Sequence, residues 1–312
     1  MKALVAAPRE DANPEIREVD EPTPGPHDAL IAVRAVSLNR GEVRSLATAA
    51  EGWRPGWDVA GEVVTAAPDG SGPGEGERVV GLVAGGGWAE RAAVNTSALV
   101  PIPDALSFPA ASTLPVAGLT AHAALGIGGV IDGRRVLVTG AAGGVGRFAV
   151  QLAAHGGATV TAIVGSTERG EGLVELGAAE VVVAMPTQGE FDLILESVGG
   201  ESLATALTLL AAGGTVVSFG NSSRQPTTFD VNAFRRKGGE TLYGLVLAHE
   251  LAKMGAAVRD LAYLAGLTAT GRLDPQISVV ADWSDAADLT RALMDRQVKG
   301  KAVLLIRADE RP

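Results

Sequence analysis

The 312-residue sequence predicts an α/β protein with two domains, a barrel-like unit of short strands and a doubly wound parallel sheet. Two different residue patterns along the chain support this class. Residues 1–105 are rich in glycine, proline and short segments that alternate polar with apolar residues. From residue 134 to 247, unbroken aliphatic runs alternate with helical segments, which is typical of βαβ units.

The first domain is predicted from alternation with a period of two residues, bounded by glycine and proline. This pattern indicates short strands that bury one face. It occurs at 29–38, 57–67, 77–85 and 88–94, and the Gly- and Pro-rich segment 68–77 is expected to be a loop. We therefore expect a β-barrel or sandwich over residues 1–117.

The second domain is predicted from aliphatic runs without alternation, because helices cover both faces of a parallel sheet. Strands are expected at 134–140, 159–165, 180–184, 191–199, 214–220 and 241–247. Helices are expected at 145–155, 167–176 and 201–210. This domain spans residues 118–247.

The tail, residues 248–312, contains the patterns of a helix, a strand, a second helix and a final strand. They are expected at 249–270, 275–280, 284–297 and 301–306. We expect the tail to rejoin the first domain, with the sheet domain inserted between its two parts.

Composition excludes several classes of function. A formal net charge of −10 argues against nucleic acid or an anionic membrane as the main partner. The absence of cysteine removes disulfides and thiolate zinc ligands, and the four histidines are scattered, so no metal site is expected. No apolar run is long enough to span a bilayer, and the amino terminus soon becomes charged, which predicts a cytoplasmic protein.

Residues 136–146, VLVTGAAGGVG, place four glycines between a strand and a helix. Glycines at this spacing permit a tight turn, close approach of backbone N–H groups to a pyrophosphate, and close packing of helix on strand. An ordinary tight turn is the alternative, but the spacing favours nucleotide binding. The predicted phosphate loop contains Gly140, Ala141, Ala142, Gly143, Gly144, Val145 and Gly146.

The end of the next strand indicates which dinucleotide binds. NAD sites usually place a carboxylate there to hold the ribose 2′-hydroxyl. This chain has Ser166 and Thr167 instead, followed by Arg169, which suits the 2′-phosphate of NADP. The alternative is that Ser166 or Thr167 caps a helix and Arg169 is solvated.

Seven stretches resemble the zinc-independent medium-chain dehydrogenases/reductases, in their quinone oxidoreductase (zeta-crystallin-like) and enoyl reductase branch. They are residues 37–45, 54–64, 76–94, 114–125, 136–146, 191–200 and 298–306. The resemblance implies a GroES-like barrel domain interrupted by a Rossmann domain. It also implies a homodimer, paired through the exposed sheet edge at 241–247.

The zinc-dependent members of that superfamily carry a cysteine in the stretch that corresponds to 37–43, and Gly-His-Glu where this chain has Gly56, Trp57 and Asp58. Neither ligand is present. The resemblance therefore implies zinc-independent, NADPH-dependent transfer of hydride to a quinone or to the activated C=C of an enone or enoyl substrate. Two alternatives remain open: a pathway-specific enoyl or ketone reductase of secondary metabolism, and a non-catalytic NADPH-binding protein.

The resemblance also implies site residues. Asn39 and Glu42 match positions beside the nicotinamide, and Thr120 matches a threonine that touches it. Arg44 stands where quinone reductases often carry tyrosine, so it is either a cationic pocket wall or a solvated side chain.

Further cofactor contacts are expected at the carboxyl ends of the parallel strands and in the tail. Tyr243 is alternatively a core aromatic, and Lys301, near the family's cleft, is alternatively a surface lysine. The expected residues are Ser197, Val198, Phe219, Gly220, Asn221, Tyr243, Gly244, Leu245 and Lys301.

Overall fold

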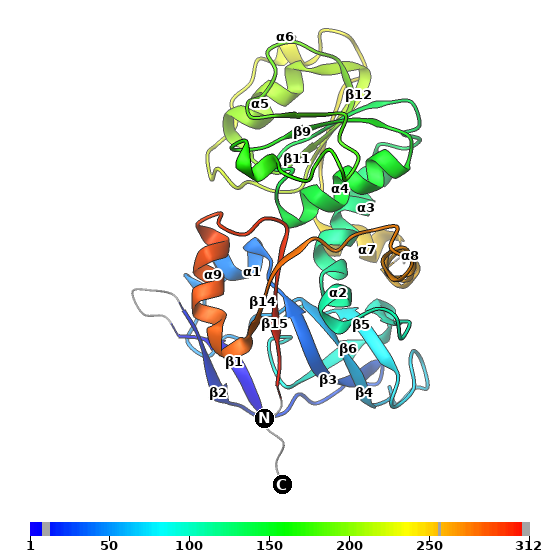
Figure 1. Ribbon diagram of the computed structural model, residues 1–312, viewed down its shortest axis with the longest axis vertical. Helices are drawn as coiled ribbons and strands as arrows, with labels where there is room; N and C mark the ends of the chain where they lie inside the picture. The colour runs from blue at the N-terminus through cyan, green and yellow to red at the C-terminus, as the bar shows by residue number, and fades with distance from the viewer. Residues whose placement is uncertain (8–12, 255–256, 308–312) are drawn as a thin grey trace. The chain divides into compact units, whose positions relative to one another are not determined.

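The computed structural model describes residues 1–7, 13–254 and 257–307 of the chain (Figure 1). The chain divides into two compact units. Unit 1 is built from Met1–Leu119 and Met254–Pro312, and unit 2 from Thr120–Lys253. In the described part of the chain, no helix combines the length and the apolar character that a membrane crossing requires.

Unit 1 is dominated by a seven-stranded sheet in the order β14-β15-β3-β4-β5-β7, with β6 paired to β3. The strand β15 of the tail pairs antiparallel with β3, so the two ends of the chain share one sheet. These strands are β3 (Asp28–Ser37), β4 (Asp58–Thr65), β5 (Arg78–Leu82), β6 (Arg91–Asn95), β7 (Leu99–Pro101), β14 (Ile277–Asp282) and β15 (Lys301–Leu305).

A separate antiparallel pair, β1 (Lys2–Ala6) with β2 (Pro14–Glu18), also belongs to unit 1. Sequence patterns did not predict this pair, because each strand has only five residues. The helices of this unit are α1 (Arg40–Leu46), α2 (Phe108–Ser112), α8 (Ala257–Ala269) and α9 (Ala286–Met294).

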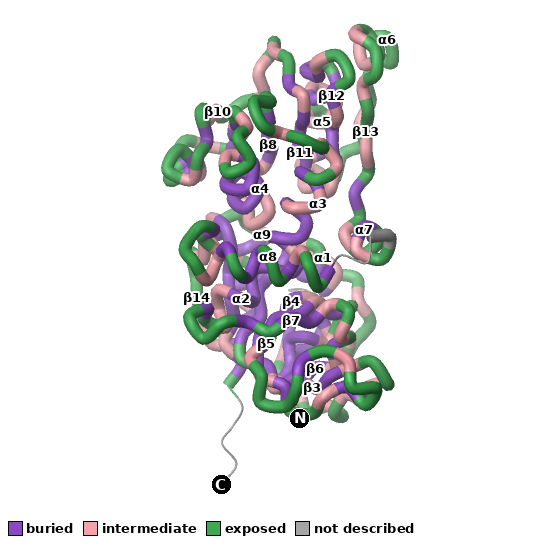
Figure 2. Tube along the Cα trace, turned by 90° about the vertical axis from the view of Figure 1, so that its right-hand side faces the viewer, coloured by how far each residue is buried: buried purple, intermediate pink, exposed green. Residues whose placement is uncertain are grey.

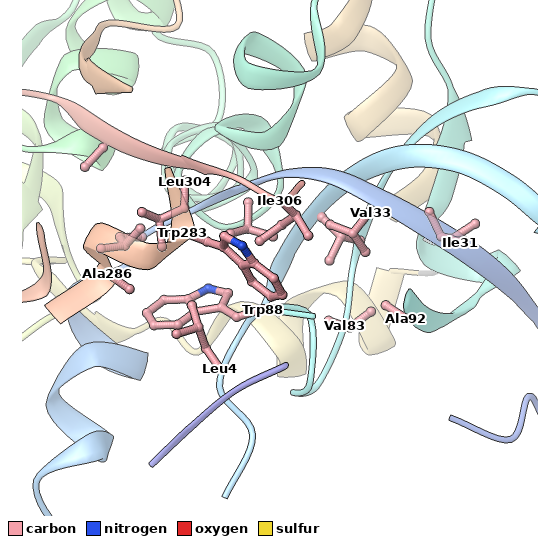
Figure 3. Packing of buried hydrophobic residues seen from close by; sticks show 14 of the residues in the cluster. Leu4, Ile31, Val33, Val83, Trp88, Ala92, Trp283, Ala286, Leu304 and Ile306 are labelled. Atoms are coloured by element: carbon pink, nitrogen blue, oxygen red, sulfur yellow. The ribbon is translucent and has the colours of Figure 1, made fainter. Parts of the chain in front are cut away.

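The core of unit 1 is apolar and includes two tryptophans. Trp88 and Trp283 are buried among aliphatic side chains such as Leu4, Leu304 and Ile306 (Figure 3). Trp283 opens a 3-10 turn, Trp283–Asp285, that leads into α9. Since the tail supplies three of these five residues, its helix and strands complete the core that the first part of the chain begins.

Unit 2 contains a six-stranded sheet in the order β10-β9-β8-β11-β12-β13, and every pairing in it is parallel. This confirms the predicted doubly wound sheet and the α/β class. The strands are β8 (Arg135–Val138), β9 (Thr159–Ile163), β10 (Glu180–Val182), β11 (Phe191–Glu196), β12 (Leu210–Ser218) and β13 (Thr241–Gly244).

Helices connect and cover these strands. The helix α4 packs on β8 and β9, and α5 packs on β11 and β12. The helices of unit 2 are α4 (Gly144–His155), α5 (Gly200–Thr208), α6 (Val231–Phe234) and α7 (Leu247–Met254), and α3 (Leu119–Ile127) begins at the boundary. The central strands β8 and β11 are buried, whereas the edge strand β13 is intermediate to exposed (Figure 2).

Three predicted elements of unit 2 were wrong in extent. The helix expected at 167–176 is a 3-10 turn, Glu168–Gly170, followed by turns, because Gly172 adopts a positive φ. The strand β12 begins at Leu210, where a helix was expected to end. The last strand stops at Gly244 rather than at residue 247, since α7 begins at Leu247.

The helix expected at 249–270 is described as two helices, α7 and α8. Residues 255–256, which fall inside the expected helix, lie outside the described chain. The two helices also fall largely in different units, because the boundary stands between Lys253 and Met254.

Candidate active site

The carboxyl edge of the parallel sheet gathers most of the residues that the sequence singled out. Within unit 2, the phosphate loop follows β8, and the other predicted cofactor contacts follow or end β9, β11, β12 and β13. Ligands of open α/β sheets bind at this edge, where neighbouring strands lead to crossovers in opposite directions. That switch point lies between β8 and β11, since β9 and β12 flank them on the outer sides.

Two loops are joined at the switch point. The Ser197 backbone N–H donates to Thr139 Oγ1 at 2.9 Å, and Ser197 Oγ donates to the Thr139 carbonyl oxygen at 3.2 Å. Thr139 directly precedes Gly140, so these bonds tie the start of the phosphate loop to the loop after β11.

Glu196, fully buried at the end of β11, organises the same loop. Its carboxylate accepts hydrogen bonds from the backbone N–H groups of Val198 (3.0 Å) and Gly199 (3.0 Å) and from Ser202 Oγ (2.9 Å). Donors therefore surround this buried carboxylate, as a charged group away from water requires. The result is a fixed backbone path for Ser197 and Val198.

Three of the four loop glycines differ in how strongly the fold requires them. Gly140 has a φ of +60°, and a Cβ there would stand 2.6 Å from Ser197 Oγ. A Cβ on Gly146 would stand 2.5 Å from the Gly140 carbonyl oxygen, so α4 could not pack as closely. A Cβ on Gly143 would meet only that oxygen, at 3.3 Å, and the backbone φ of Gly143 is an ordinary −85°. The fold itself therefore demands glycine at 140 and 146, but far less at 143.

The helix α4 begins directly after Gly143. Gly143 is its N-cap residue and offers no side-chain cap. The first backbone N–H groups of a helix have no partner within the helix and carry the positive end of its dipole. An uncapped helix start beside an uncrowded glycine fits a bound phosphate or pyrophosphate.

The loop after β9 contains the residues expected at a 2′-phosphate. Thr167 begins the 3-10 turn, but its side chain makes no capping hydrogen bond, which disfavours the capping alternative. A Cβ on Gly165 would meet nothing within 4 Å, so there is open space beside this strand end. Arg169 lies in the same turn and is half-buried.

The ends of β12 and β13 complete the edge. Gly220 packs against the loop after β11, since a Cβ there would stand 2.9 Å from the Ser197 carbonyl oxygen. The hydroxyl of Tyr243 donates to the buried Glu250 of α7 at 2.6 Å. Tyr243 is therefore half-buried and polar in its contacts, so it is not a purely apolar core residue.

Unit 1 holds all but one of the remaining predicted residues, and three of these share one buried polar network. Asn39 is the N-cap residue of α1, and its backbone N–H donates to Glu42 Oε1 at 2.8 Å, which forms a capping box. The Asn39 side-chain Nδ2 donates to Glu42 Oε1 at 3.1 Å, and the Trp57 backbone N–H donates to Glu42 Oε2 at 2.8 Å.

Asp58 and Lys301 close the network. Asp58 Oδ2 accepts from Asn39 Nδ2 at 2.8 Å and from Ser37 Oγ, and its Oδ1 accepts from the Val116 backbone N–H at 2.8 Å. The Lys301 Nζ lies 3.6 Å from Asp58 Oδ2. Lys301 is only 2% exposed, so the alternative of a surface lysine is wrong.

Burial changes the pKa values of two ionisable side chains in the network. Loss of hydration, together with the nearby Asp58 carboxylate, raises the pKa of Glu42 to about 8, although the hydrogen bonds from Asn39 and the Lys301 ammonium oppose this shift. Burial also lowers the pKa of Lys301, against the attraction of Asp58 and Glu42. Glu42 therefore takes up a proton near neutral pH, in a place without water contact.

Two further predicted residues are not seen to join this network. Arg44 lies in the last turn of α1, and its Nε is buried without a hydrogen-bond partner in the described part of the chain. Thr120, the first residue of unit 2, is buried in α3.

Sequence patterns missed two buried carboxylates that organise these sites. Asp58 opens a strand of valine, alanine and glycine, and Glu196 ends the apolar run FDLIL. An ionisable residue inside a buried strand is rare unless it is paired, and that signal was present in the sequence.

Among the described residues, no three His, Asp or Glu side chains are grouped so that they could hold a metal ion. The expectation that this chain works without zinc stays a prediction.

Comparison with known families identifies two domains. Residues 25–104 match the model of the alcohol dehydrogenase GroES-like domain, and residues 144–261 match that of the zinc-binding dehydrogenases. The first matched segment lies in unit 1, and most of the second lies in unit 2.

Two curated relatives are more than 30% identical to this chain. The spectinabilin polyketide synthase system protein NorB of Streptomyces orinoci is 35% identical over 89% of this chain, which spans only 13% of that relative. A chloroplastic quinone-oxidoreductase homolog of Spinacia oleracea is 32% identical over 64% of this chain and 68% of its own length.

Two solved structures share the whole fold. The quinone oxidoreductase of Coxiella burnetii has a TM-score of 0.84 and 26% identity, and the match covers 98% of this chain and 99% of the other. The yhdH oxidoreductase of Salmonella enterica, solved in complex with NADP, has a TM-score of 0.80 and 26% identity over 98% of this chain and 100% of its own.

Proposed function

Since the chain belongs to the quinone oxidoreductase-like branch of the medium-chain dehydrogenases/reductases, we propose that it is an NADPH-dependent reductase of a quinone or of an activated C=C bond in an enone or enoyl compound. The strongest support is Gly143, a loop glycine that the fold hardly requires and that leaves room for a pyrophosphate. The NADP complex of the Salmonella relative supports the choice of cofactor.

The residues at the carboxyl edge of unit 2 fit this cofactor. The backbone N–H groups of 143–146 would hold the pyrophosphate at the start of α4, while Ser166, Thr167 and Arg169 would hold the 2′-phosphate. Tyr243 and the loops at Ser197 and Phe219 would form the remaining part of the cofactor site. When bound, NADPH supplies the hydride, and the protein aligns it with the acceptor.

The residues of unit 1 have supporting roles in this proposal. Reduction of an enone places negative charge on the carbonyl oxygen, which needs a hydrogen-bond donor. Arg44 is our candidate for that donor, because its buried Nε has no partner among the described residues. Both carboxylate oxygens of Glu42 already accept hydrogen bonds inside the unit, so we assign Glu42 to holding Asn39 and the start of α1.

A second candidate is an enoyl reductase that acts within a polyketide pathway. The similarity to NorB over most of this chain supports it. The chemistry is the same, but the substrate would be an enoyl thioester rather than a free quinone or enone.

The test is oxidation of NADPH, followed by absorbance, with a panel of quinones, 2-alkenals and enoyl-CoA esters. We expect turnover of at least one class, unchanged by a metal chelator. The class that turns over fastest distinguishes quinone reduction from enoyl reduction. Tight NADPH binding without turnover of any acceptor would contradict the proposal and indicate a non-catalytic NADPH-binding protein.

A further inference from the structure

The side chain of Lys301 carries a positive charge into the interior of unit 1. Its Nζ donates to the Asn39 Oδ1 atom at 2.8 Å and to the Leu38 carbonyl oxygen at 3.0 Å, and it lies 3.6 Å from Asp58 Oδ2. An ammonium has three N–H donors and no acceptor. Three oxygens around one buried ammonium form an environment built for a cation.

The same contacts determine the orientation of the Asn39 amide. Its Oδ1 faces the ammonium, whereas its Nδ2 donates to the two carboxylates, Glu42 and Asp58. A rotated amide would place an oxygen against two carboxylates and an NH₂ group against an ammonium. Lys301, Glu42 and Asp58 therefore favour the same one of the two amide orientations, and Lys301 is the group that holds the Oδ1 side.

Charge balance in the network depends on the same ammonium. The Lys301 ammonium and the carboxyl groups of Asp58 and Glu42 share a volume without water contact. If the ammonium were removed, Asp58 would lose its ion pair and Asn39 would lose the donor to its Oδ1. A buried charge that loses its partner is strongly destabilising, so the network would rearrange or take up protons.

We propose that Lys301 is a positioning residue of the active site, an internal cation that fixes the amide of Asn39 and the start of α1. Lys301 begins β15 in the tail, and Asn39 caps α1, so the last strand of the chain orients a residue near its start. The inference rests on the proposed function for one point only, that Asn39 stands beside the reacting group. It assigns to Lys301 an action through Asn39 and no contact with cofactor or substrate.

The test compares Lys301→Met, Lys301→Arg and Lys301→Ala, with Lys299→Met as the matched control in the same segment. The first readout is the side-chain ¹⁵N resonance of Asn39, identified by its loss in Asn39→Ser. We expect Lys301→Met to shift this resonance and the control to leave it unchanged. An unchanged resonance in folded Lys301→Met would overturn the proposal, whether or not the protein proves to be a reductase.

The second readout separates positioning from cofactor binding. We expect Lys301→Met to lower kcat by about 10- to 100-fold through misplacement of Asn39, while the Kd for NADPH changes less than about twofold. A loss confined to NADPH affinity would overturn the proposal, because Lys301 would then be a cofactor contact. Lys301→Arg keeps the charge but has a longer, planar head, so we expect a smaller loss of kcat than in Lys301→Met. If Lys301→Met does not fold, Lys301→Ala provides the same two readouts.

Chemical rescue tests the cation itself. Lys301→Ala removes the side chain beyond Cβ, and n-propylammonium has the matching length and charge. We expect n-propylammonium to restore the Asn39 resonance and at least about a tenth of kcat, while n-propanol at the same concentration restores neither. Equal effects of the two additives would overturn the role of the charge.

Discussion

A Cβ on Gly146 would stand 2.5 Å from the carbonyl oxygen of Gly140, at the place where α4 packs against the end of β8. A Cβ on Gly143 would stand 3.3 Å from the same oxygen. The first distance is too short for any side chain, whereas the second requires only a small adjustment. Two glycines three residues apart therefore serve different purposes, one for packing and one for a ligand.

Gly143→Val should remove cofactor binding and leave the fold intact. The side chain would occupy the space above the start of α4, where the pyrophosphate is expected, while its Cβ meets only one protein atom. We expect the Kd for NADPH to rise by at least about 100-fold, the loss of about 2.7 kcal/mol. Isothermal titration with NADPH and a thermal melt would measure the two effects.

Gly146→Val is the control for that experiment, since its side chain would collide with the backbone of Gly140 and Ala141. We expect it to lower Tm strongly. If Gly143→Val lowered Tm as much as Gly146→Val, the loop would be glycine-rich only for packing.

Arg169→Ala should weaken the preference for NADPH over NADH. A guanidinium binds a 2′-phosphate with charge-assisted hydrogen bonds but gains little from a 2′-hydroxyl. In the unmodified protein, NADPH should raise Tm more than NADH at equal concentration, because tighter binding stabilises the folded state. In Arg169→Ala, the rise in Tm caused by NADPH and the rise caused by NADH should become similar.

Arg236→Ala is a suitable control, because Arg236 is an exposed arginine near the amino ends of the strands in unit 2. It should leave both shifts unchanged. Equal shifts for NADPH and NADH in the unmodified protein would refute the 2′-phosphate site.

The edge strand β13 predicts a homodimer. Leu242 in β13 is 40% exposed and Val246, just beyond it, is 66% exposed, and among the described strands β13 has a neighbour on one side only. An uncovered apolar edge strand tends to pair with another chain. Leu242→Arg should therefore convert a dimer into a monomer in sedimentation equilibrium.

The matched control is Val280→Arg in β14, the edge strand of the sheet in unit 1, where Val280 is 48% exposed. This variant should keep the mass of the unmodified protein. A monomeric unmodified protein would contradict the predicted dimer at once.

The parallel sheet could be predicted from the sequence because its strands are continuous aliphatic runs that need no partner to be recognised. The same logic failed at 167–176, where the spacing of apolar residues resembled a helix but Gly172 adopts a positive φ that interrupts one. The backbone conformation of a glycine therefore determined the secondary structure of this segment more strongly than the spacing of its apolar residues did.

The buried network of unit 1 could be predicted only in part. The resemblance pointed to Asn39 and Glu42, which are three residues apart. Asp58 and Lys301 join them only after β4 and β15 pair with β3, and no local pattern specifies that pairing. The resemblance therefore indicated Asn39, Glu42 and Lys301, but not Asp58 and not the pairing that brings Lys301 to this helix start.

Glu42 should make stability depend on pH. Its pKa in the folded protein is about 8, above the ordinary value of 4.5, so the folded state binds this proton more tightly than the unfolded state. The free energy of unfolding should therefore fall as pH rises from about 5 to 8, with a slope that approaches about 1.4 kcal/mol per pH unit. The lowered pKa of Lys301 has the opposite sign and acts up to its ordinary value of 10.5.

Urea unfolding at several pH values between 5 and 8 measures this dependence. Glu42→Gln cannot ionise but keeps one oxygen for the capping hydrogen bond from Asn39, so its stability should vary much less over this range. Glu18→Gln, at an exposed position, should follow the unmodified protein. Parallel curves for the unmodified protein and Glu42→Gln would mean that Glu42 is ionised in the folded protein throughout, and that its three N–H donors outweigh burial and Asp58.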